Sequence, residues 1–563
     1  MEKIWLKSYP KGVPEEVPES QYRSLRDMLE AAFAEHADKP CYANLGTTLT
    51  FADIERLSRQ FGAYLQKTLG LTRGERVAIM MPNVLQYPVV LYGILRAGLV
   101  VVNVNPLYTA RELKHQLSDS GARAIVILEN FAHVLEEVID DTEIEQVMTT
   151  RIGDMHPWPR STFLNFAVKH IKKLVPPFSL PGAITLDHAL KQGADQTLEH
   201  VEIGLADLAF LQYTGGTTGL SKGAMLSHRN LVYNVEQAIA WTADSLTEFE
   251  GEELIAIAAL PLYHSFALQA NALCIMVQGG LNVLITNPRD FPAFVKQIAP
   301  YRFSYFNAVN TMFVALLNTP GFDKLDFSGL RLTIGGGMAV QEPIARKWKE
   351  ITGTVIVQGY GLTETSPTAV VHLVDSERFD GSIGLPVSST LIKICDDDGN
   401  ELPIGELGEI CIKGPQVMEG YWKQPEETAK VMLPGGWLRT GDIGRMDQGG
   451  FIYIEDRKKD MILVGGFNVY PNEIETVAVE LDGIVEAAAV GVPDEKSGER
   501  VYLFVVRNKP ELTEAQIIEH CRKSLTGYKV PRKIIFRDDL PKTNVGKILR
   551  RELREEAIAA ASS

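Results

Sequence analysis

The sequence predicts an α/β protein. We expect a large N-terminal domain of parallel-rich sheets covered by helices, an antiparallel β subdomain within it, and a small mobile C-terminal α+β domain. Apolar strand patterns alternate with helical patterns between residues 75 and 361, whereas short strands separated by turns follow from about 382 to 456. A charged segment then precedes a compact α/β pattern that runs to the end of the 563 residues. A chain of this length is expected to form more than one domain.

The predicted strands of the large domain are nearly continuous apolar runs. Runs of this kind with helices between them are typical of parallel sheets covered on both faces. The candidate strands are Arg76–Met81, Ala124–Leu128, Leu208–Gln212, Leu254–Leu260, Leu281–Thr286, Phe303–Phe306, Leu330–Ile334 and Val355–Gln358, and the candidate helices between them include Asn83–Ala97 and Val340–Ile351. Ligands bind beyond the carboxyl ends of such strands. We therefore expect the segments that begin at Tyr213, Gly335 and Gly359 to converge on one cleft.

Turn residues mark the β subdomain, which we place at about 382–456. Asp398–Asn400, Gly435–Gly436 and Gly449–Gly450 separate its short strands, a pattern that indicates antiparallel pairing. The N-terminal domain is expected to span 1–456, a hinge 457–460, and the C-terminal domain 461–563. A charged segment between two folding units favours a hinge, and a plain surface turn is the alternative.

Composition excludes several classes of protein. The net charge of −15 argues against a nucleic-acid partner. Five scattered cysteines without a CxxC pair indicate reduced thiols in the cytoplasm and no zinc site. Met1–Ser20 lacks the apolar core of a signal peptide. Pro88, Arg96 and Gly98 interrupt the apolar stretch Val84–Val104, which favours a helix followed by a strand over a membrane span.

A Gly- and hydroxyl-rich run directly follows the strand at Leu208. Glycines allow backbone N–H groups to turn toward an anion, hydroxyls add donors, and Lys222 adds a mobile positive charge. The motif is not a Walker A loop, because Lys222 lies three residues beyond Gly219 rather than next to it. We predict a phosphate-binding loop, with an ordinary surface loop as the alternative. Its residues are Tyr213, Thr214, Gly215, Gly216, Thr217, Thr218, Gly219, Leu220, Ser221, Lys222, Gly223 and Ala224.

Three further segments carry candidate chemistry. In 358–365, Glu364 offers a carboxylate ligand for Mg²⁺, which takes one or two protein oxygens and completes its coordination with phosphate and water. Tyr360 in the same segment offers a flat surface for a base. A plain strand-to-helix turn is the alternative. In 437–442, Asp442 could accept both hydroxyls of a ribose, and Arg457 could return to the same cleft. In 541–551, Gly546 frees a loop from which Lys547 could reach out of the small domain, although a basic run is usually a solvated face.

Ser161–Val175 has an apolar face and a basic face at helical spacing. Such a segment is typical of a helix that lies in a membrane interface. The alternative is a surface helix whose apolar face meets the core.

These segments, in this order, resemble the adenylate-forming superfamily of acyl-CoA synthetases, adenylation domains and luciferases. The resemblance spans residues 25 to 555, and within the superfamily the chain is similar to bacterial long-chain fatty-acyl-CoA synthetases. Supporting stretches are Met81–Gln86, Val102–Glu112, Leu260–Phe266, Asp456–Glu475 and Leu525–Pro531. Gly216 stands where many relatives have serine, and Lys459 where many have aspartate.

The resemblance implies a role for each segment. The run from Tyr213 to Ala224 binds the ATP phosphates, with Thr217 among its catalytic residues, and Lys547 bridges the carboxylate and the α-phosphate. Glu364 holds Mg²⁺, Lys459 is the hinge, and His264 approaches the acyl carboxylate, although a core histidine is the alternative. The remaining implied cofactor-binding residues are Gly335, Gly336, Gly337, Gly359, Tyr360, Gly361 and Thr363 around the nucleotide, Asp442 and Arg457 at the ribose, and Gly465 and Gly466 along the pantetheine arm.

The implied reaction is the ligation of a long-chain fatty acid to coenzyme A. ATP, fatty acid and CoA give acyl-CoA, AMP and pyrophosphate through an acyl-adenylate, with Mg²⁺ as cofactor, and the product feeds fatty-acid degradation and lipid metabolism. We expect Asn307–Leu317 to line the acyl pocket. Alternatives are a medium-chain or aryl acid:CoA ligase on the same scaffold, a membrane-associated nucleotide sensor without catalysis, and a luciferase-type oxygenase. A homodimer and peripheral contact with the inner face of the membrane are further expectations.

Overall fold

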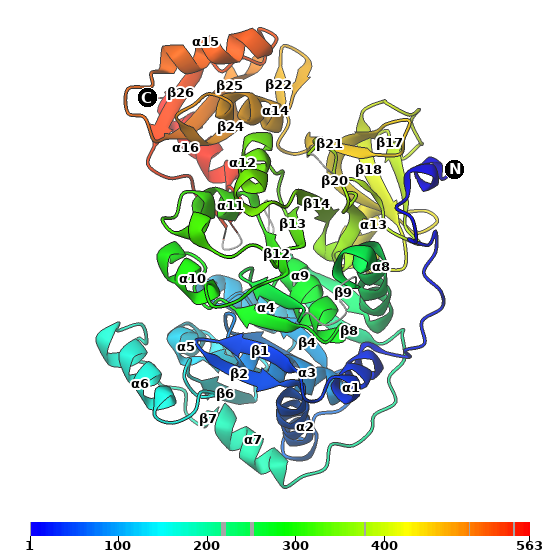
Figure 1. Cartoon of the computed structure of the whole chain (residues 1–563), viewed down its shortest axis with the longest axis vertical. Helices are drawn as coiled ribbons and strands as arrows, with labels where there is room; N and C mark the ends of the chain where they lie inside the picture. Colours follow the sequence, from blue (N-terminus) through cyan, green and yellow to red (C-terminus); the bar gives the residue numbers. More distant parts are fainter. Residues whose placement is uncertain are drawn as a thin grey trace.

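The computed structural model describes residues 2–214, 221–247, 253–376, 379–494, 496–543 and 546–562. Two helix-covered sheets form the large domain, an antiparallel sheet lies beside them, and the small domain caps one end of the molecule (Figure 1). The predicted fold class is therefore confirmed. Strand β21 (Ile452–Arg457) belongs to the antiparallel sheet, and the next strand, β22 (Ile462–Val464), belongs to the small domain.

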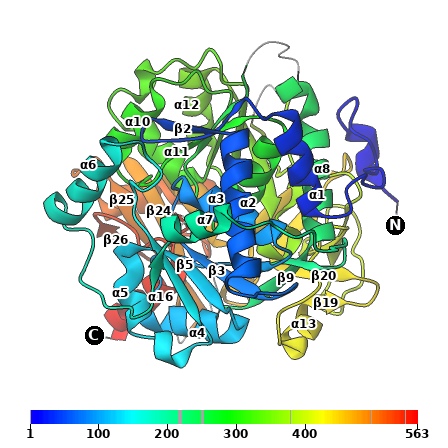
Figure 2. The same ribbon diagram turned by 90° about the horizontal axis from the view of Figure 1, so that it is seen from below.

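The N-terminal sheet is parallel except at its β9 edge, where β9 runs antiparallel to β8. Its order is β7 (Ile184–Thr185), β6 (Gln146–Thr150), β5 (Ala124–Leu128), β3 (Arg76–Met80), β4 (Val100–Asn103), β8 (Leu208–Tyr213), β9 (Gly223–Ser227). Helices α2 (Phe51–Lys67), α3 (Gln86–Arg96) and α7 (Leu186–Ala194) pack together beside it (Figure 2). The sequence did not reveal β9, because its five residues overlap the end of the predicted phosphate loop and are too few for a periodic pattern.

The central sheet has a parallel core and antiparallel edges. Its order is β16 (Leu385–Pro386), β15 (Thr368–Val371), β14 (Ile356–Gly361), β13 (Leu332–Gly336), β12 (Tyr305–Ala308), β10 (Ile255–Ala258), β11 (Leu281–Leu284), β1 (Pro40–Asn44), β2 (Thr47–Thr50). The helices around it include α8 (His228–Thr247), the π-helix η5 (Leu268–Ile275), α10 (Phe291–Ile298), α11 (Asn310–Leu317) and α12 (Glu342–Thr352). Strands β13 and β14 extend into their glycines, beyond the predicted ends. A Cβ on Gly336 would lie 2.9 Å from the Gly359 carbonyl oxygen, so this close backbone approach favours glycine.

The β subdomain is antiparallel, as predicted. It consists of β17 (Leu391–Cys395), β18 (Gly408–Lys413), β19 (Met432–Leu433), β20 (Trp437–Met446) and β21. In the small domain, β26 (Lys533–Arg537) pairs parallel with β25 (Gly498–Arg507), and the other pairs are antiparallel. The other elements of that domain are β23 (Phe467–Val469), β24 (Ile484–Asp494), α14 (Pro471–Val479), α15 (Glu514–Ser524) and α16 (Arg550–Ser562).

Candidate active site

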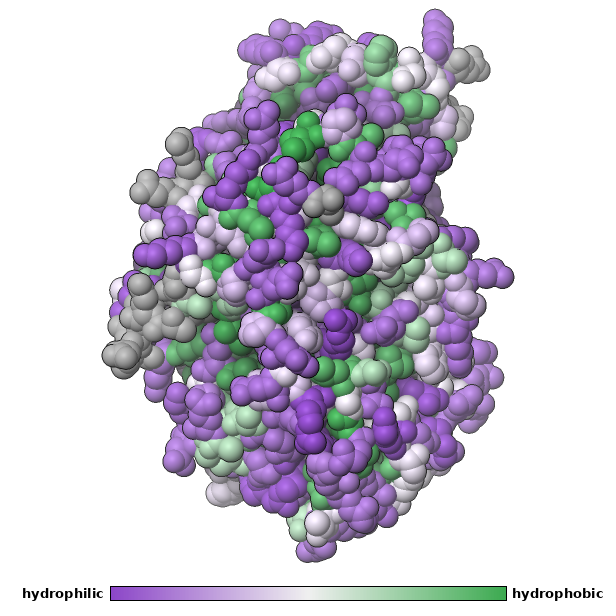
Figure 3. Space-filling model, turned by 90° about the vertical axis from the view of Figure 1, so that its right-hand side faces the viewer, coloured by the Kyte–Doolittle hydropathy of each residue, from purple (hydrophilic) through white to green (hydrophobic). Residues whose placement is uncertain are grey.

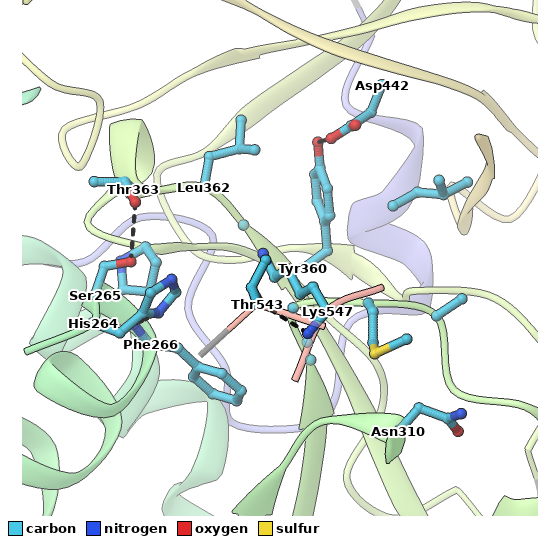
Figure 4. A pocket seen from close by; sticks show the side chains of 18 of the residues that line it. His264, Ser265, Phe266, Asn310, Tyr360, Leu362, Thr363, Asp442, Thr543 and Lys547 are labelled. Carbon is cyan, nitrogen blue, oxygen red and sulfur yellow. Dashed lines mark hydrogen bonds between the residues drawn. The ribbon is translucent and has the colours of Figure 1, made fainter. Parts of the chain in front are cut away.

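A cavity of about 1950 Å³ lies between the large and the small domain. Its wall includes the ends of three strands of the large domain, β8, β13 and β14. It also includes parts of β20 and β21 and the loop before α16. Parallel strands bring their carboxyl ends to one edge of a sheet, and ligands bind there. Segments that lie hundreds of residues apart thus meet in one site. Figure 4 shows several of the side chains that line it.

Lys547 reaches from the small domain into this cavity (Figure 4). The Thr311 hydroxyl of the large domain donates a hydrogen bond to the Gly546 carbonyl oxygen at 3.0 Å, and the Lys547 backbone N–H donates to the Thr543 hydroxyl at 3.0 Å. The φ of Gly546 is +82°, and a Cβ there would lie 2.7 Å from the Thr311 hydroxyl, so the loop favours glycine. The small domain therefore presents its lysine directly to the large domain.

The ammonium of Lys547 has an unusual electrostatic setting. Protein surrounds the side chain, although it keeps some exposure to the cavity, and this enclosure lowers its pKa to about 8. Arg457 lowers the pKa further, whereas Asp442 and Glu364 oppose the shift. An anionic ligand in the cavity would add an opposite charge and favour the protonated form.

Asp442 is buried between an aromatic and a basic partner. The Tyr360 hydroxyl donates to Asp442 Oδ2 at 2.7 Å, and Arg457 Nε lies 3.3 Å from Asp442 Oδ1. The antiparallel pairing of β20 with β21 sets Asp442 directly opposite Arg457. The sequence identified both residues, and the strand register explains why they meet. The arrangement offers a carboxylate and a ring to one ligand, as a ribose with an attached base requires.

The predicted nucleotide-flanking residues also line the cavity. Gly335 and Gly336 end β13, Gly337 follows it, and Gly359 and Gly361 lie at the end of the adjacent β14. The φ of Gly337 is +76°, a conformation that favours glycine, and the Cε of Lys547 lies 3.4 Å from where a Cβ there would be, which is an ordinary van der Waals distance. Thr363 also lines the cavity. Its hydroxyl lies 3.3 Å from the hydroxyl of Ser265, the residue that follows His264.

Glu364 lies in the 3₁₀ turn η7 (Thr363–Thr365) on the cavity wall. The Tyr421 hydroxyl donates to Glu364 Oε1 at 2.6 Å, and the Met418 N–H donates to the Glu364 carbonyl oxygen at 2.9 Å. In the described part of the chain, no cluster of three or more His, Cys, Asp or Glu side chains could hold a metal ion. A single carboxylate nevertheless fits Mg²⁺, which takes one or two protein oxygens and fills its remaining positions with phosphate and water.

The phosphate loop is described only at its two ends. Gly215, Gly216, Thr217, Thr218, Gly219 and Leu220 lie outside the described residues. At the base of the loop, the Thr214 N–H donates to the Lys222 carbonyl oxygen at 2.9 Å, and β8 pairs Gln212 with Ala224 and Tyr213 with Gly223. The loop is therefore the connection of a hairpin at the cavity edge.

Lys222 does not point freely into the cavity. Its ammonium forms an ion pair with Glu427 and lies 5.0 Å from the centroid of the Tyr421 ring. Tyr421 thus joins Lys222 to Glu364. Sequence reasoning missed Tyr421 and Glu427, and no local pattern could have revealed them, because they lie about 200 residues from the lysine they contact.

His264 lies on the cavity wall with its ring half-buried. Burial, and then the nearby Lys547, lower its pKa to about 3, so the imidazole is neutral. Its Nδ1 accepts from the Phe266 N–H at 3.4 Å. A neutral ring beside the lysine can accept or donate a hydrogen bond without adding positive charge.

Gly465 and Gly466 lie outside the cavity in this arrangement of the domains. They form the exposed tip of the β22–β23 hairpin, with φ values of +59° and +84°. Lys459 lies at the cavity rim between the two domains. Their proposed roles, in pantetheine binding and as a hinge, thus require a second position of the small domain.

Part of the cavity lining is apolar, and we call this part the apolar arm. Trp241, Ala270, Ile275 and Tyr305 contribute to its wall. Of the segment 307–317, expected to line this pocket, only Asn310 and Thr311 are among the lining residues, and the large side chains of that segment pack in the core. The expectation was thus wrong for most of the segment, since α11 turns its apolar face toward α12 and β12.

Comparisons with known proteins cover nearly the whole chain. A family model described as AMP-binding enzyme matches residues 29–422, and one described as AMP-binding enzyme C-terminal domain matches residues 473–547. The long-chain-fatty-acid–CoA ligase of Escherichia coli O6:H1 is 56% identical over 557 residues, which are 99% of each chain. The long-chain-fatty-acid–CoA ligase of Bacillus subtilis is 38% identical, over 99% of this chain and 98% of its own.

Solved structures show the same architecture. The anthranilate CoA ligase AuaEII in complex with anthranoyl-AMP matches with a TM-score of 0.84 and 26% identity, over 97% of this chain and 99% of its own. ATP-bound MatB from Rhodopseudomonas palustris matches with a TM-score of 0.81 and 28% identity, over 95% and 99%.

Proposed function

Because the chain belongs to the AMP-binding enzyme family, we propose that it ligates long-chain fatty acids to coenzyme A. The two relatives that are 56% and 38% identical over 99% of the chain are long-chain-fatty-acid–CoA ligases. The observation that carries the proposal is the meeting of Lys547, Asp442 and Glu364 in one cavity that also has an apolar arm. A positive charge, a ribose-binding carboxylate, a metal-binding carboxylate and a lipid-binding wall are the groups this reaction requires.

In the first half-reaction, the fatty-acid carboxylate attacks the α-phosphorus of ATP and pyrophosphate leaves. Both reactants are anionic, so the protein must offset their repulsion. Lys547 supplies a preorganised positive charge between the two groups, and charges fixed in advance stabilise a transition state most effectively. Asp442 and Tyr360 hold the ribose and the base. Mg²⁺, held by Glu364, would neutralise phosphate charge.

In the second half-reaction, the CoA thiolate attacks the acyl carbonyl and AMP leaves. The thiol needs access to the face that Lys547 occupies in this structure. Rotation of the small domain about Lys459 would withdraw the lysine and bring the hairpin with Gly465 and Gly466 to the cavity. The exposure of these glycines at a hairpin tip supports this proposal.

The alternatives are less well supported. A sensor without catalysis needs no lysine at the α-phosphate, whereas Lys547 lies in the cavity. The relatives at 56% and 38% identity are named for long-chain fatty acids, which favours a long-chain acid over a medium-chain or aryl acid.

AMP release tests the proposed function. Purified protein is incubated with ATP and Mg²⁺ and a series of saturated acids from acetate to stearate, with and without CoA. We expect CoA-dependent turnover that is highest for long-chain acids. Highest turnover with a short or aryl acid would show that the proposed substrate class is wrong. Nucleotide binding without AMP release would show that the proposed ligase activity is wrong.

We further propose that residues 160–174 bind an anionic membrane surface. Neither α6 (Arg160–Phe166) nor the π-helix η4 (Ala167–Ile171) that continues it contains a buried residue. The expected alternative, a helix whose apolar face meets the core, is thus wrong. The exposed apolar side chains are those of Trp158, Phe163, Phe166, Ile171 and Leu174, and the exposed basic ones include those of Arg160, Lys169, Lys172 and Lys173.

This combination suits a lipid interface better than water. Apolar side chains gain free energy by entering the acyl boundary, and each Lys or Arg near an anionic surface contributes about 1 kcal/mol. Among the described residues, no helix combines the length and apolar character needed to cross a membrane. Contact at the surface would place the enzyme where its fatty acid is dissolved.

Vesicle sedimentation tests the membrane proposal. Wild-type protein should sediment with vesicles that contain phosphatidylserine, and a variant with Lys169→Glu, Lys172→Glu and Lys173→Glu should not. Lys191→Glu, on the exposed side of α7, serves as the control and should sediment like the wild type. Equal sedimentation of the triple variant and the wild type would contradict the proposal.

Cell fractionation tests the predicted cytoplasmic location, and light scattering tests the predicted homodimer.

A further inference from the structure

The N-terminal segment runs beside the β subdomain (Figure 1). The 3₁₀ helix η1 (Ile4–Ser8) holds Trp5, which is 1% exposed and packs against Gly450. A Cβ on Gly450 would lie 2.4 Å from the Trp5 Cα, so the close approach favours glycine. Figure 3 shows this side of the molecule, where hydrophilic residues surround small, separate hydrophobic groups.

Hydrogen bonds fix the segment on both sides of Tyr9. The Ser8 hydroxyl donates to the Gly449 carbonyl oxygen at 2.7 Å, and the Ser388 hydroxyl donates to the Pro14 carbonyl oxygen at 2.6 Å. The Ser389 N–H donates to the Glu15 carbonyl oxygen at 2.9 Å. An N-terminal segment is usually poorly ordered unless it is tied down in this way.

Tyr9 packs against Trp241, which lines the cavity. The two ring centroids lie 5.2 Å apart at an interplanar angle of 86°, an edge-to-face arrangement. The Tyr9 hydroxyl donates to the Pro386 carbonyl oxygen at 2.6 Å, and Trp241 Nε1 donates to the His372 carbonyl oxygen at 3.1 Å. Tyr9 itself is not among the lining residues, so Trp241 separates it from the cavity.

Trp241 lies farther along α8 from the Glu364 turn than Asn234 does. Asn234, on α8, donates a hydrogen bond to the Thr368 carbonyl oxygen, close to the Glu364 turn. Trp241, farther along the same helix, donates one to the His372 carbonyl oxygen. Seven residues of helix advance about 10 Å, and four residues of strand advance about 13 Å. Both elements therefore place Trp241 on the order of 10 Å farther from Glu364 than Asn234 is.

We propose that Tyr9 sets the length of acyl chain that the enzyme accepts, by holding Trp241 as a wall of the acyl arm. It is a positioning residue, because it acts through Trp241 rather than on the fatty acid. This inference rests on the proposed function and deepens it. The segment thus couples the N-terminus of the chain to substrate choice.

Steady-state kinetics with saturated acids from decanoate to docosanoate test the proposal. In Tyr9→Ala, Trp241 can move into the vacated space, so the acid with the highest kcat/KM should become longer. For acids beyond the wild-type optimum, kcat/KM should rise by about fourfold for each methylene group that newly enters the apolar arm. The KM for ATP should stay unchanged, which a general loss of structure would not allow.

Three further variants sharpen the test. Tyr9→Phe keeps the ring and should keep the wild-type optimum, and Tyr22→Ala removes a tyrosine of the same N-terminal region that does not line the arm. Trp241→Ala should shift the optimum as Tyr9→Ala does, and the double variant should show no additional shift, because coupled residues are not additive. If Tyr9→Ala does not fold, Tyr9→Leu, which keeps apolar bulk without the ring edge, should still shift the optimum.

The outcomes separate the two proposals. If the wild type shows no CoA-dependent AMP release with any acid, the proposed function fails. If the wild type is an active ligase but Tyr9→Ala or Tyr9→Leu keeps its chain-length optimum, or if Tyr22→Ala shifts it equally, the inference about Tyr9 is wrong.

Discussion

Replacing Lys547 with alanine should slow formation of the acyl-adenylate and leave thioester formation intact. Lys547 reaches the cavity only through the loop that Thr311 holds at Gly546. In the proposed mechanism, its positive charge is needed while the carboxylate attacks the α-phosphorus. Once the adenylate exists, the CoA thiolate attacks a different atom, and the lysine has to make way for it.

The magnitude follows from the enclosure of the ammonium. A unit charge about 4 Å from an anionic oxygen, at an effective dielectric constant of about 20, contributes about 4 kcal/mol. That corresponds to a rate factor of about 10³, and deletion of a preorganised donor in an oxyanion site costs about 10² to 10³. We therefore expect the adenylation rate of Lys547→Ala to fall by about 10² to 10³.

Two separate assays measure the half-reactions. Exchange of labelled pyrophosphate into ATP reports adenylation, and conversion of supplied acyl-adenylate to acyl-CoA reports thioester formation. The pH profile adds a signature of the lysine, since enclosure lowers its pKa to about 8. Above that pH, kcat/KM for adenylation should fall about tenfold per pH unit, whereas any activity of Lys547→Arg should persist to higher pH because arginine stays charged.

The control and the refuting result are specific. Arg551→Ala removes a positive charge from the same segment, but its exposed side chain pairs with Glu555, so both half-reactions should stay unchanged. If Lys547→Ala slows both half-reactions equally, the assignment of the lysine to adenylation alone is wrong.

Four other variants and one control test the rest of the site. Glu364→Gln should raise the Mg²⁺ concentration needed for half-maximal adenylation, and an unchanged Mg²⁺ dependence would refute the metal role of Glu364. Tyr421→Phe should raise that Mg²⁺ concentration about tenfold, because Glu364 loses a hydrogen bond to its charged carboxylate. Lys459→Pro should spare adenylation and block thioester formation, and loss of both, or of neither, would count against a hinge. Gly361→Ala should lower the free energy of unfolding by about 1–3 kcal/mol or more, since its Cβ would lie 1.7 Å from the Pro367 carbonyl oxygen. Gly204→Ala is the control, because the nearest atom to a Cβ there is 3.9 Å away. Urea unfolding of this variant should give nearly the wild-type free energy of unfolding. Equal losses of free energy in Gly361→Ala and Gly204→Ala would refute the steric argument.

Much of the fold could be predicted because periodicity is a local property. The parallel strands at Arg76, Ala124 and Leu208 are continuous apolar runs, and the structure has strands at each of them. Strand β9 was missed because its antiparallel partner, not its own pattern, defines it. The helix at Arg160 has an apolar face in the sequence, but only the packing shows that this face meets no core.

The sequence by itself determined the chemistry of the site. The segments that carry Lys222, Glu364, Asp442 and Lys547, in this order, resemble the adenylate-forming superfamily, although each segment alone left an ordinary turn or surface as the alternative. Only the tertiary structure decided which partners these groups meet. Tyr421 on Glu364, Glu427 on Lys222 and Tyr9 behind Trp241 join residues 57 to 232 positions apart. Such contacts arise from the packing of whole elements, and no local pattern records them.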